Sequence, residues 1–249
     1  MFKGFYNLTS GMLSQGRRLD VIANNMTNVA TSGYKSDIYT DSTFQEYMVS
    51  RVGNKDKSAP EELGGASYIL APSKLYTDYT QGALEPTDMP FDFALEGEGF
   101  FAVRTDDGIA YTRSGSFALD EEGYLCLPGA GRVLDIAKEP ILLGTDMIRS
   151  DSTGAIFTED GGYLGQLGVY AFEDNGQLER NPQGLFVGGG EPQASAATVH
   201  WKTIERANVD LVKEMTSMMT AQRAFQSAAQ LSKMYDELMT KAATNLGNV

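Results

Sequence analysis

Apolar side chains recur at heptad spacing near both ends of the chain. In the first thirty residues, intervals of three and four residues separate Phe5, Leu8, Met12, Leu19, Ile22, Met26 and Val29, with Gln15 as the polar member of the series. This spacing is typical of a coiled-coil seam, because it keeps one helix face towards a partner. We therefore predict a helix from about Lys3 to Ala30, ended by Ser32 and Gly33.

The same spacing returns in the last forty residues. It runs through Leu211, Met215, Met218, Phe225 and Ala229, with Gln222 in the series, and resumes after a phase slip at Leu231, Tyr235, Leu238 and Ala242. A slip of this kind resembles a stutter. The pattern predicts a second helix from about Asn208 to Leu246. A single helix in water cannot bury either stripe, so we expect the two ends to pair with each other or with neighbouring copies, and function to lie in assembly.

Strand patterns occupy the middle of the chain. Phe100–Arg104 and Ile109–Thr112 flank Asp106-Asp107-Gly108, and an Asp-Gly turn between strands is a strong hairpin signal. A second hairpin is expected where residues 116–119 turn through 120–123 into 124–126. Further short strands are predicted at 155–157, 167–172, 184–187 and 199–201. Spacing of this kind suits a sandwich or an irregular barrel.

Together these patterns predict an α+β fold. Long terminal α-helices pair as a coiled coil, and the central domain is mostly antiparallel β, a sandwich or an irregular barrel. The expected segments are an N-terminal helix over residues 1–35, an extended linkage region over 36–90, the central β domain over 91–198, and a return segment with the C-terminal helix over 199–249. Residues 36–90 are assigned to linkage because polar clusters, Pro and Gly separate their short apolar runs.

Composition and charge narrow the class of function. The chain has 249 residues, 42% of them hydrophobic, which is enough to bury a core, and its formal net charge is −13. Residues 85–125 carry ten acidic side chains against two basic ones, whereas residues 1–35 carry a net charge of +3. Nucleic-acid binding is disfavoured, because it depends on neutralising phosphates with basic side chains.

The sequence shows neither the pattern of a conventional secretory signal nor that of a membrane span. Polar residues interrupt the N-terminus before an apolar run develops, and no stretch is long and apolar enough for a membrane span. Composition alone indicates the cytosol, unless the chain is exported by a route that reads no cleavable signal. Cys126 is the single cysteine, so no disulfide or thiolate zinc site can form within the chain, and we expect it to be a buried small apolar residue.

Candidate catalytic residues are few. Glu96, Glu98, Asp106 and Asp107 raise the possibility of a two-carboxylate hydrolase, but acids in hairpin turns are usually solvated turn formers. His200 is the only histidine and is read as structural. Residues 120–123 lack the alternating oxygen ligands of an EF-hand loop. We therefore predict no enzyme activity, no catalytic residue, no metal, no cofactor and no small-molecule substrate.

Four sequence blocks resemble the bacterial flagellar rod and hook protein family. They are the run Asp20–Lys35 (DVIANNMTNVATSGYK), then Gln81-Gly82-Ala83-Leu84 with Thr87 and Pro90, then Gly97–Phe101 and Tyr111–Phe117, and finally Ala207–Asp210 with Glu214-Met215 and Gln222–Phe225. The chain is most similar to the distal-rod type, because it has an ordinary opening helix and lacks room for the larger outer domains of hook subunits.

The resemblance implies a structural role without chemistry. Paired terminal helices of such proteins line a hollow helical tube, which transmits torque from motor to hook and passes exported subunits. The expected partners are the chain itself, other flagellar rod and hook proteins, and the flagellar type III export apparatus. The expected location is the flagellar basal body, reached without a cleaved signal peptide and across the periplasm or cell wall.

Assembly contacts are expected on both terminal helices. The predicted interface consists of Phe5, Leu8, Met12, Leu19, Ile22, Asn24, Asn25, Met26, Asn28, Val29, Leu211, Met215, Met218, Phe225 and Leu238. The three asparagines either bond neighbouring copies or lie on a polar helix face. Met215, Met218, Met219, Met234 and Met239 are read as adaptable core filling. Tyr34 and Trp201 either wedge the junction of helix and β region or join the core.

Two alternative functions stay open at this stage. A surface adhesin would bind a glycan through Phe100, Phe101, Tyr111 and Phe117, with the helices as a stalk, although the alternation of these residues within strands favours the core. An assembly chaperone or cap would form small closed oligomers. For a rod subunit, the exposed seams predict ends that are largely disordered before assembly and ordered by it.

Overall fold

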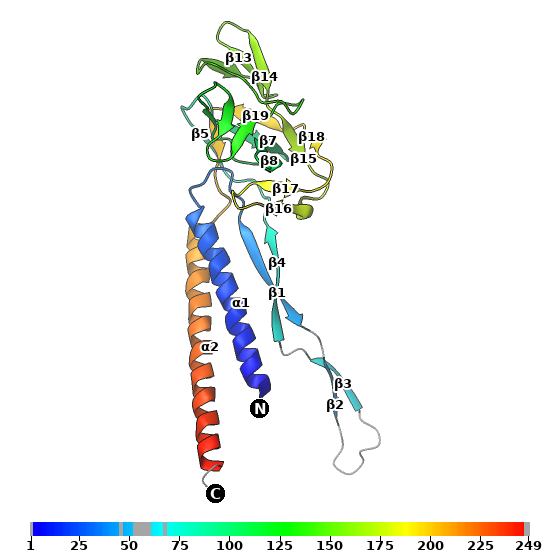
Figure 1. Ribbon diagram of the computed structural model, residues 1–249, viewed down its shortest axis with the longest axis vertical. Coiled ribbons are helices and arrows are strands. Elements are labelled where there is room, and N and C mark those ends of the chain that lie inside the picture. The colour runs from blue at the N-terminus through cyan, green and yellow to red at the C-terminus, as the bar shows by residue number, and fades with distance from the viewer. Residues whose placement is uncertain (1, 45–46, 52–60, 67–68, 247–249) are drawn as a thin grey trace. The chain divides into compact units, whose positions relative to one another are not determined.

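The computed structural model describes residues 2–44, 47–51, 61–66 and 69–246 (Figure 1). The chain divides into two compact units, each built from separate stretches of sequence. The helical unit comprises Met1–Met26, Asp37–Tyr76 and Asp210–Val249, and the β body comprises Thr27–Ser36 and Thr77–Val209. Parts of the predicted linkage region 36–90, residue 1 and residues 247–249 lie outside the described residues.

Two long helices form most of the helical unit. They are α1 (Phe2–Thr27) and α2 (Leu211–Leu246), which confirms both predicted helices with ends shifted by no more than three residues. At 1.5 Å per residue they span about 39 Å and about 54 Å. The carboxylate of Asp210 accepts hydrogen bonds from the backbone N–H groups of Val212 and Lys213 at 3.0 and 3.1 Å, and so caps the start of α2.

Four strands complete the helical unit. Strand β1 (Asp37–Phe44) pairs with β4 (Ile69–Thr77), and β2 (Tyr47–Arg51) pairs antiparallel with β3 (Glu61–Ala66). Polar contacts join β1 to α1: the Asp41 carboxylate accepts from the Ser14 hydroxyl and from Arg18, the latter at 3.3 Å. The side chain of Asn25 exchanges two hydrogen bonds with the backbone of Asp37, at 2.9 and 3.0 Å. Part of the predicted linkage region is therefore a set of paired strands.

Short strands build the β body. They are β5 (Leu84–Pro86), β6 (Phe93–Glu96), β7 (Phe100–Thr105), β8 (Gly108–Thr112), β9 (Ala118–Leu119), β10 (Leu125–Leu127), β11 (Gly131–Val133), β12 (Ile148–Ser150), β13 (Ala155–Thr158), β14 (Tyr163–Gln166), β15 (Val169–Ala171), β16 (Leu178–Arg180), β17 (Phe186–Gly188), β18 (Gln193–Ala194), β19 (Thr198–Trp201) and β20 (Thr203–Glu205), with a 3-10 turn at Asn175–Gln177.

The largest sheet has the strand order β16-β17-β8-β7-β11-β10-β9, and β15 pairs with both β7 and β18. Both predicted hairpins are confirmed, since β7 pairs antiparallel with β8 across Asp106 and Asp107, and β9 pairs antiparallel with β10. A three-stranded sheet β12-β13-β14 and the pairs β19-β6 and β5-β20 complete the body.

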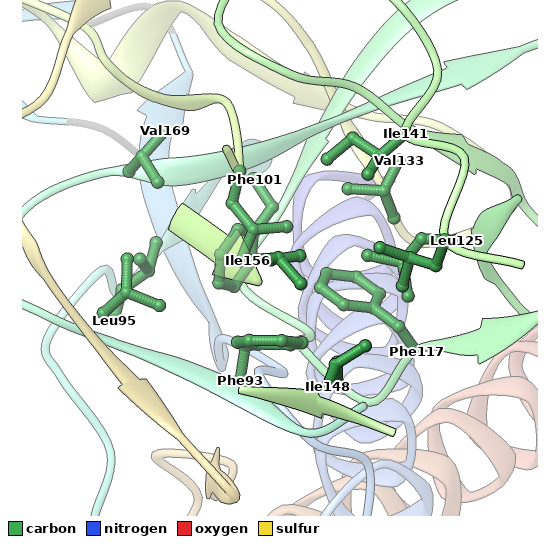
Figure 2. Close-up of a cluster of buried hydrophobic side chains, with 13 residues drawn as sticks. Phe93, Leu95, Phe101, Phe117, Leu125, Val133, Ile141, Ile148, Ile156 and Val169 are labelled. Atoms are coloured by element: carbon green, nitrogen blue, oxygen red, sulfur yellow. The ribbon is translucent and has the colours of Figure 1, made fainter. Parts of the chain in front are cut away.

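Strand β7 is buried on both faces. Phe101 belongs to a cluster with Phe93, Phe117 and Leu125 (Figure 2), whereas its neighbour Phe100 packs into a second cluster with Phe172 and Phe186. Because side chains alternate across a strand, the run of apolar residues in β7 supplies two cores at once.

The coarse prediction of an α+β fold with a mostly antiparallel β domain is confirmed, but the barrel alternative is wrong. Among the described strands, the largest sheet ends at β16 and β9, which are not paired with each other, so it does not close. Strand spacing along a sequence reports how many strands there are, but it does not report whether the first and last strands of a sheet meet.

Candidate functional site

The residues predicted for assembly on α1 differ in exposure. Ile22 and Asn25 are buried, at 6% and 2% exposure. Phe5 and Asn24 are exposed. The other predicted residues are partly buried: Leu8, Met12, Leu19 and Met26 on α1, and Asn28 and Val29, which follow α1 in the β body. Within the helical unit, the seam of α1 is thus covered in the middle and more open at its start.

The predicted residues of α2 are mostly uncovered. Leu211, Met215 and Leu238 are 41%, 50% and 64% exposed, whereas Met218 and Phe225 are partly buried. Met219 and Met234 are also more than half exposed, so these methionines do not fill a core within one copy of the chain. Many apolar side chains along α2 therefore lack cover within the described part of the chain.

Some predicted residues of α1 and α2 line common pockets. Met12 of α1 and Phe225 of α2 line one pocket of about 340 Å³. Ile22 and Asn25 line a groove of about 500 Å³ with Ala221 of α2 and Tyr39 of β1. The Asn25 amide also donates to the Glu214 carboxylate at 3.2 Å. Asn25 is therefore not on a solvated polar face; it joins α1 to β1 and to α2.

A buried ionic cluster lies within the β body. The ammonium of Lys35 contacts one carboxylate oxygen of Glu205 at 2.6 Å, and the guanidinium of Arg113 contacts the other at 3.3 Å. The exposed fractions of these three side chains are 1%, 0% and 5%. Arg113 also donates to the backbone oxygens of Leu95 and Gly97, at 3.4 and 2.5 Å, and Lys35 donates to that of Thr80 at 2.7 Å.

Backbone hydrogen bonds surround the cluster. The backbone N–H of Gly33 donates to the Glu205 backbone oxygen at 2.7 Å, and that of Gly82 donates to its carboxylate at 2.9 Å. The Asn208 side chain accepts from the Ser36 N–H at 2.7 Å and donates to the backbone oxygen of Asp78 at 2.8 Å. Four stretches that are distant in sequence therefore meet at this cluster: residues 33–36, 78–82, 113 and 205–208.

Burial governs the electrostatics of the cluster. It lowers the pKa of Lys35 below its ordinary value, while the hydrogen bond and the charge of Glu205 oppose that change. Burial also lowers the pKa of Arg113, again against the attraction of Glu205. A buried cation is costly unless an anion compensates it, and here one carboxylate serves two cations.

Comparisons with known proteins identify the family. The sequence family described as "Flagella basal body rod protein" matches residues 5–35, "Flagellar hook protein FlgE/F/G D1 domain" matches 94–150, and "Flagellar basal body rod FlgEFG protein C-terminal" matches 202–246. The chain is 31% identical to the flagellar hook-basal body complex protein FlhO of Bacillus subtilis over 272 residues, which cover 100% of both chains. The chain belongs to the flagellar basal-body rod protein family.

Other relatives agree with this assignment. The chain is 32% identical to the flagellar basal-body rod protein FlgG of Bacillus subtilis, over 96% of this chain and 97% of that one. It is 30% identical to the flagellar basal-body rod protein FlgF of Mesorhizobium japonicum, over 100% and 99% of the two chains. As a member of the rod family, the chain is a structural subunit of the flagellar basal body and not an enzyme.

Each of the three matched segments supplies one charge to the ionic cluster. Lys35 is the last residue of the first segment, Arg113 lies in the second and Glu205 in the third. Sequence reasoning missed the cluster, because a single Lys, Arg or Glu in a polar stretch looks like a surface residue. The available signal was that Lys35 and Arg113 lie inside the quoted family blocks and that Glu205 lies two residues before one.

The structure argues against the glycan-binding alternative, because the aromatic residues proposed to bind a sugar are buried. Phe100, Phe101, Tyr111 and Phe117 are 2%, 0%, 6% and 6% exposed, so they belong to the two cores and offer no aromatic face to a sugar. No group of three or more His, Cys, Asp or Glu side chains suited to a metal ion occurs among the described residues. Neither of the two described helices has the length and apolar composition of a membrane span.

Four other side chains take structural positions. His200 contacts Glu96 at 2.7 Å across the β19-β6 pair. Trp201 donates from its indole to the backbone oxygen of Pro90 at 2.7 Å, and Tyr34 lies under the guanidinium of Arg180 at 4.8 Å. Cys126 is only half-buried, so the expectation of a buried residue is wrong for this position in β10, which is next to the edge strand β9.

Proposed function

We propose that this rod subunit polymerises through α1 and α2 into a hollow helical tube of the distal-rod type. In that tube the terminal helices pair as a coiled coil, the assembled rod transmits torque from motor to hook, and exported subunits pass through its lumen. The interface would include the residues of both helices predicted from the heptad pattern. The partners are further copies of the chain and other flagellar rod and hook proteins.

The observation that carries this proposal is the number of exposed apolar side chains along α2. They are between 41% and 74% accessible: Leu211, Val212, Met215, Met219, Leu231, Met234 and Leu238. Exposed apolar surface of this extent usually marks a protein interface. Two unlike helices offer unlike faces, and unlike faces form heterologous contacts, which generate open helical polymers when the rotation does not close.

The proposal also covers the route to the site of assembly. The subunit would leave the cytoplasm through the flagellar type III export apparatus without a cleaved signal peptide, and would cross the periplasm or cell wall as part of the growing rod. The support is the membership of the chain in the flagellar basal-body rod family.

Deletion of the gene in its host tests the function directly. We expect electron cryotomography of the cell envelope to show rods that stop at a fixed level, with no hook, and we expect swimming to be abolished. The level at which the rod stops would give the position of the subunit in the stack. Intact flagella and normal swimming in the deletion strain would contradict the proposal.

A further inference from the structure

The two chain segments that lead to the helices meet at the ionic cluster. Residues 28–36 of the β body follow α1, and residues 205–209 precede α2; we call these two segments the helix roots. Three hydrogen bonds join one root to the other: Gly33 N–H to Glu205 O at 2.7 Å, Ser36 N–H to Asn208 Oδ1 at 2.7 Å, and Asn208 N–H to Tyr34 O at 3.4 Å. Lys35 and Glu205 add the buried ion pair at 2.6 Å.

The rest of the β body holds both roots in place. Arg113, next to the end of β8, reaches Glu205, and Gly82 donates to the same carboxylate. Asp78 and Thr80 accept from Asn208, while Thr80 also accepts from Lys35. Each root is therefore fixed by side chains of the other root and by a third part of the chain.

Stability alone is a weak reason for such a cluster. A buried ion pair repays its desolvation only partly, and apolar residues of similar volume are often at least as stable. What an ionic and hydrogen-bonded cluster adds is geometry, because each partner must lie at a particular distance and angle. The positions fixed here are those at which the chain enters and leaves the β body on its way from α1 and to α2.

We propose that Glu205 is a positioning residue for assembly: with Lys35, Arg113 and Asn208 it fixes the two helix roots against each other, so that both terminal helices start from one defined place. This inference rests on the proposed polymerisation through α1 and α2. It assigns Glu205 and Asn208 a role in incorporation that goes beyond keeping the β body folded.

The first test separates geometry from stability. In the triple variant Glu205→Gln/Lys35→Met/Arg113→Met, the carboxylate is replaced by a neutral amide and both cations by apolar side chains, so the desolvation cost is removed together with the attraction and no buried charge is left unpaired. We expect the β body to melt near the wild-type temperature while the amount of subunit in purified hook–basal bodies falls roughly tenfold. Wild-type incorporation by a stably folded triple variant would overturn the proposal.

A second variant decides the question if the triple variant does not fold. Asn208→Ala removes the bonds to Ser36, Asp78 and Thr80 without leaving a buried charge unpaired. The matched control is Asp151→Ala, which removes side-chain bonds to the backbone N–H groups of Thr153 and Ala155 in the turn between β12 and β13. We expect a roughly tenfold loss of incorporation for Asn208→Ala only. Equal incorporation of the two variants would overturn the positioning role.

The wild-type arm of the same assay distinguishes the two hypotheses. The variants are expressed in the deletion strain, and the amount exported is measured beside the amount in the basal body. If the wild-type subunit itself is missing from purified basal bodies, the proposed function fails, and this inference fails with it. If the wild type is present and the variants match it, only the positioning role fails.

Discussion

Arg180 shows how one side chain can serve both packing and hydrogen bonding. Its guanidinium donates to the Lys35 backbone oxygen at 2.7 Å and lies 4.8 Å from the Tyr34 ring and 5.3 Å from the Phe186 ring. A planar guanidinium can stack on aromatic rings while its edge donates, whereas an ammonium cannot do both. Arg180 therefore supports the N-terminal helix root from the side of β16.

We expect a moderate loss of stability of the β body when the Arg180 guanidinium can no longer stack on the aromatic rings. We predict that Arg180→Lys lowers the free energy of unfolding of the β body by about 1–2 kcal/mol, because the charge remains but the stacking is lost. Thermal unfolding followed by near-ultraviolet circular dichroism would measure it. The control is Arg149→Lys on the exposed side of β12, and the same melting temperature for both variants would count against this account.

At the level of the elements, the sequence predicted the helices and the hairpin, because both depend on residues close together along the chain. The heptad spacing located α1 and α2 to within three residues, and the Asp-Gly turn located the β7-β8 hairpin. Strands β1 and β4 were not predicted, because their residues lie far apart along the chain and neither has a clear alternation. The ionic cluster was not predictable for the same reason: Lys35 and Glu205 are 170 positions apart.

The helix faces give a prediction for assembly. Leu19→Asp on α1 or Leu238→Asp on α2 should leave the melting of the β body unchanged and reduce incorporation roughly tenfold or more, since a buried unpaired carboxylate at an interface is costly. Swimming in soft agar and the subunit content of purified basal bodies would measure the effect. The control is Leu142→Asp, at a 52% exposed position of the β body. Normal motility of both helix variants would refute the prediction.

A second prediction concerns the helices before assembly. Gly4, Gly11 and Gly16 each lower the helix propensity of α1 by roughly 1 kcal/mol relative to Ala, so α1 should be marginal in a free monomer. We expect the circular dichroism signal at 222 nm to increase on polymerisation. Space is open around Gly11 and Gly16, so Gly11→Ala/Gly16→Ala should raise the monomer signal. Equal helix content in monomer and polymer would contradict folding upon assembly.

At the level of the whole molecule, charge is divided unequally between the two units. The segments of the β body contain 22 Asp and Glu against nine Lys and Arg, a net charge of −13, whereas the segments of the helical unit contain eleven of each. The net charge of the chain therefore belongs to the β body. When copies of the chain assemble through their helices, their negatively charged β bodies would therefore repel each other.

This separation predicts how polymerisation depends on salt. Because the screening length falls from about 30 Å at 0.01 M to about 8 Å at 0.15 M, the critical concentration for polymerisation should fall as sodium chloride is raised over that range. Light scattering of the purified subunit would measure it. Neutralising four exposed acids, Asp106→Asn, Glu121→Gln, Glu159→Gln and Glu191→Gln, should weaken the dependence. A critical concentration that rises with salt would rule out repulsion between bodies.

The backbone N–H of Asp78 donates a hydrogen bond to the backbone oxygen of Ser36 at 2.8 Å, and this bond has a consequence for the segment between them. It places the two ends of the segment 37–76 side by side on the β body, so that segment is topologically an insertion. A join of a few residues from Ser36 to Thr77 would close the chain without moving either end. The length of this segment can therefore change without a change in the β body.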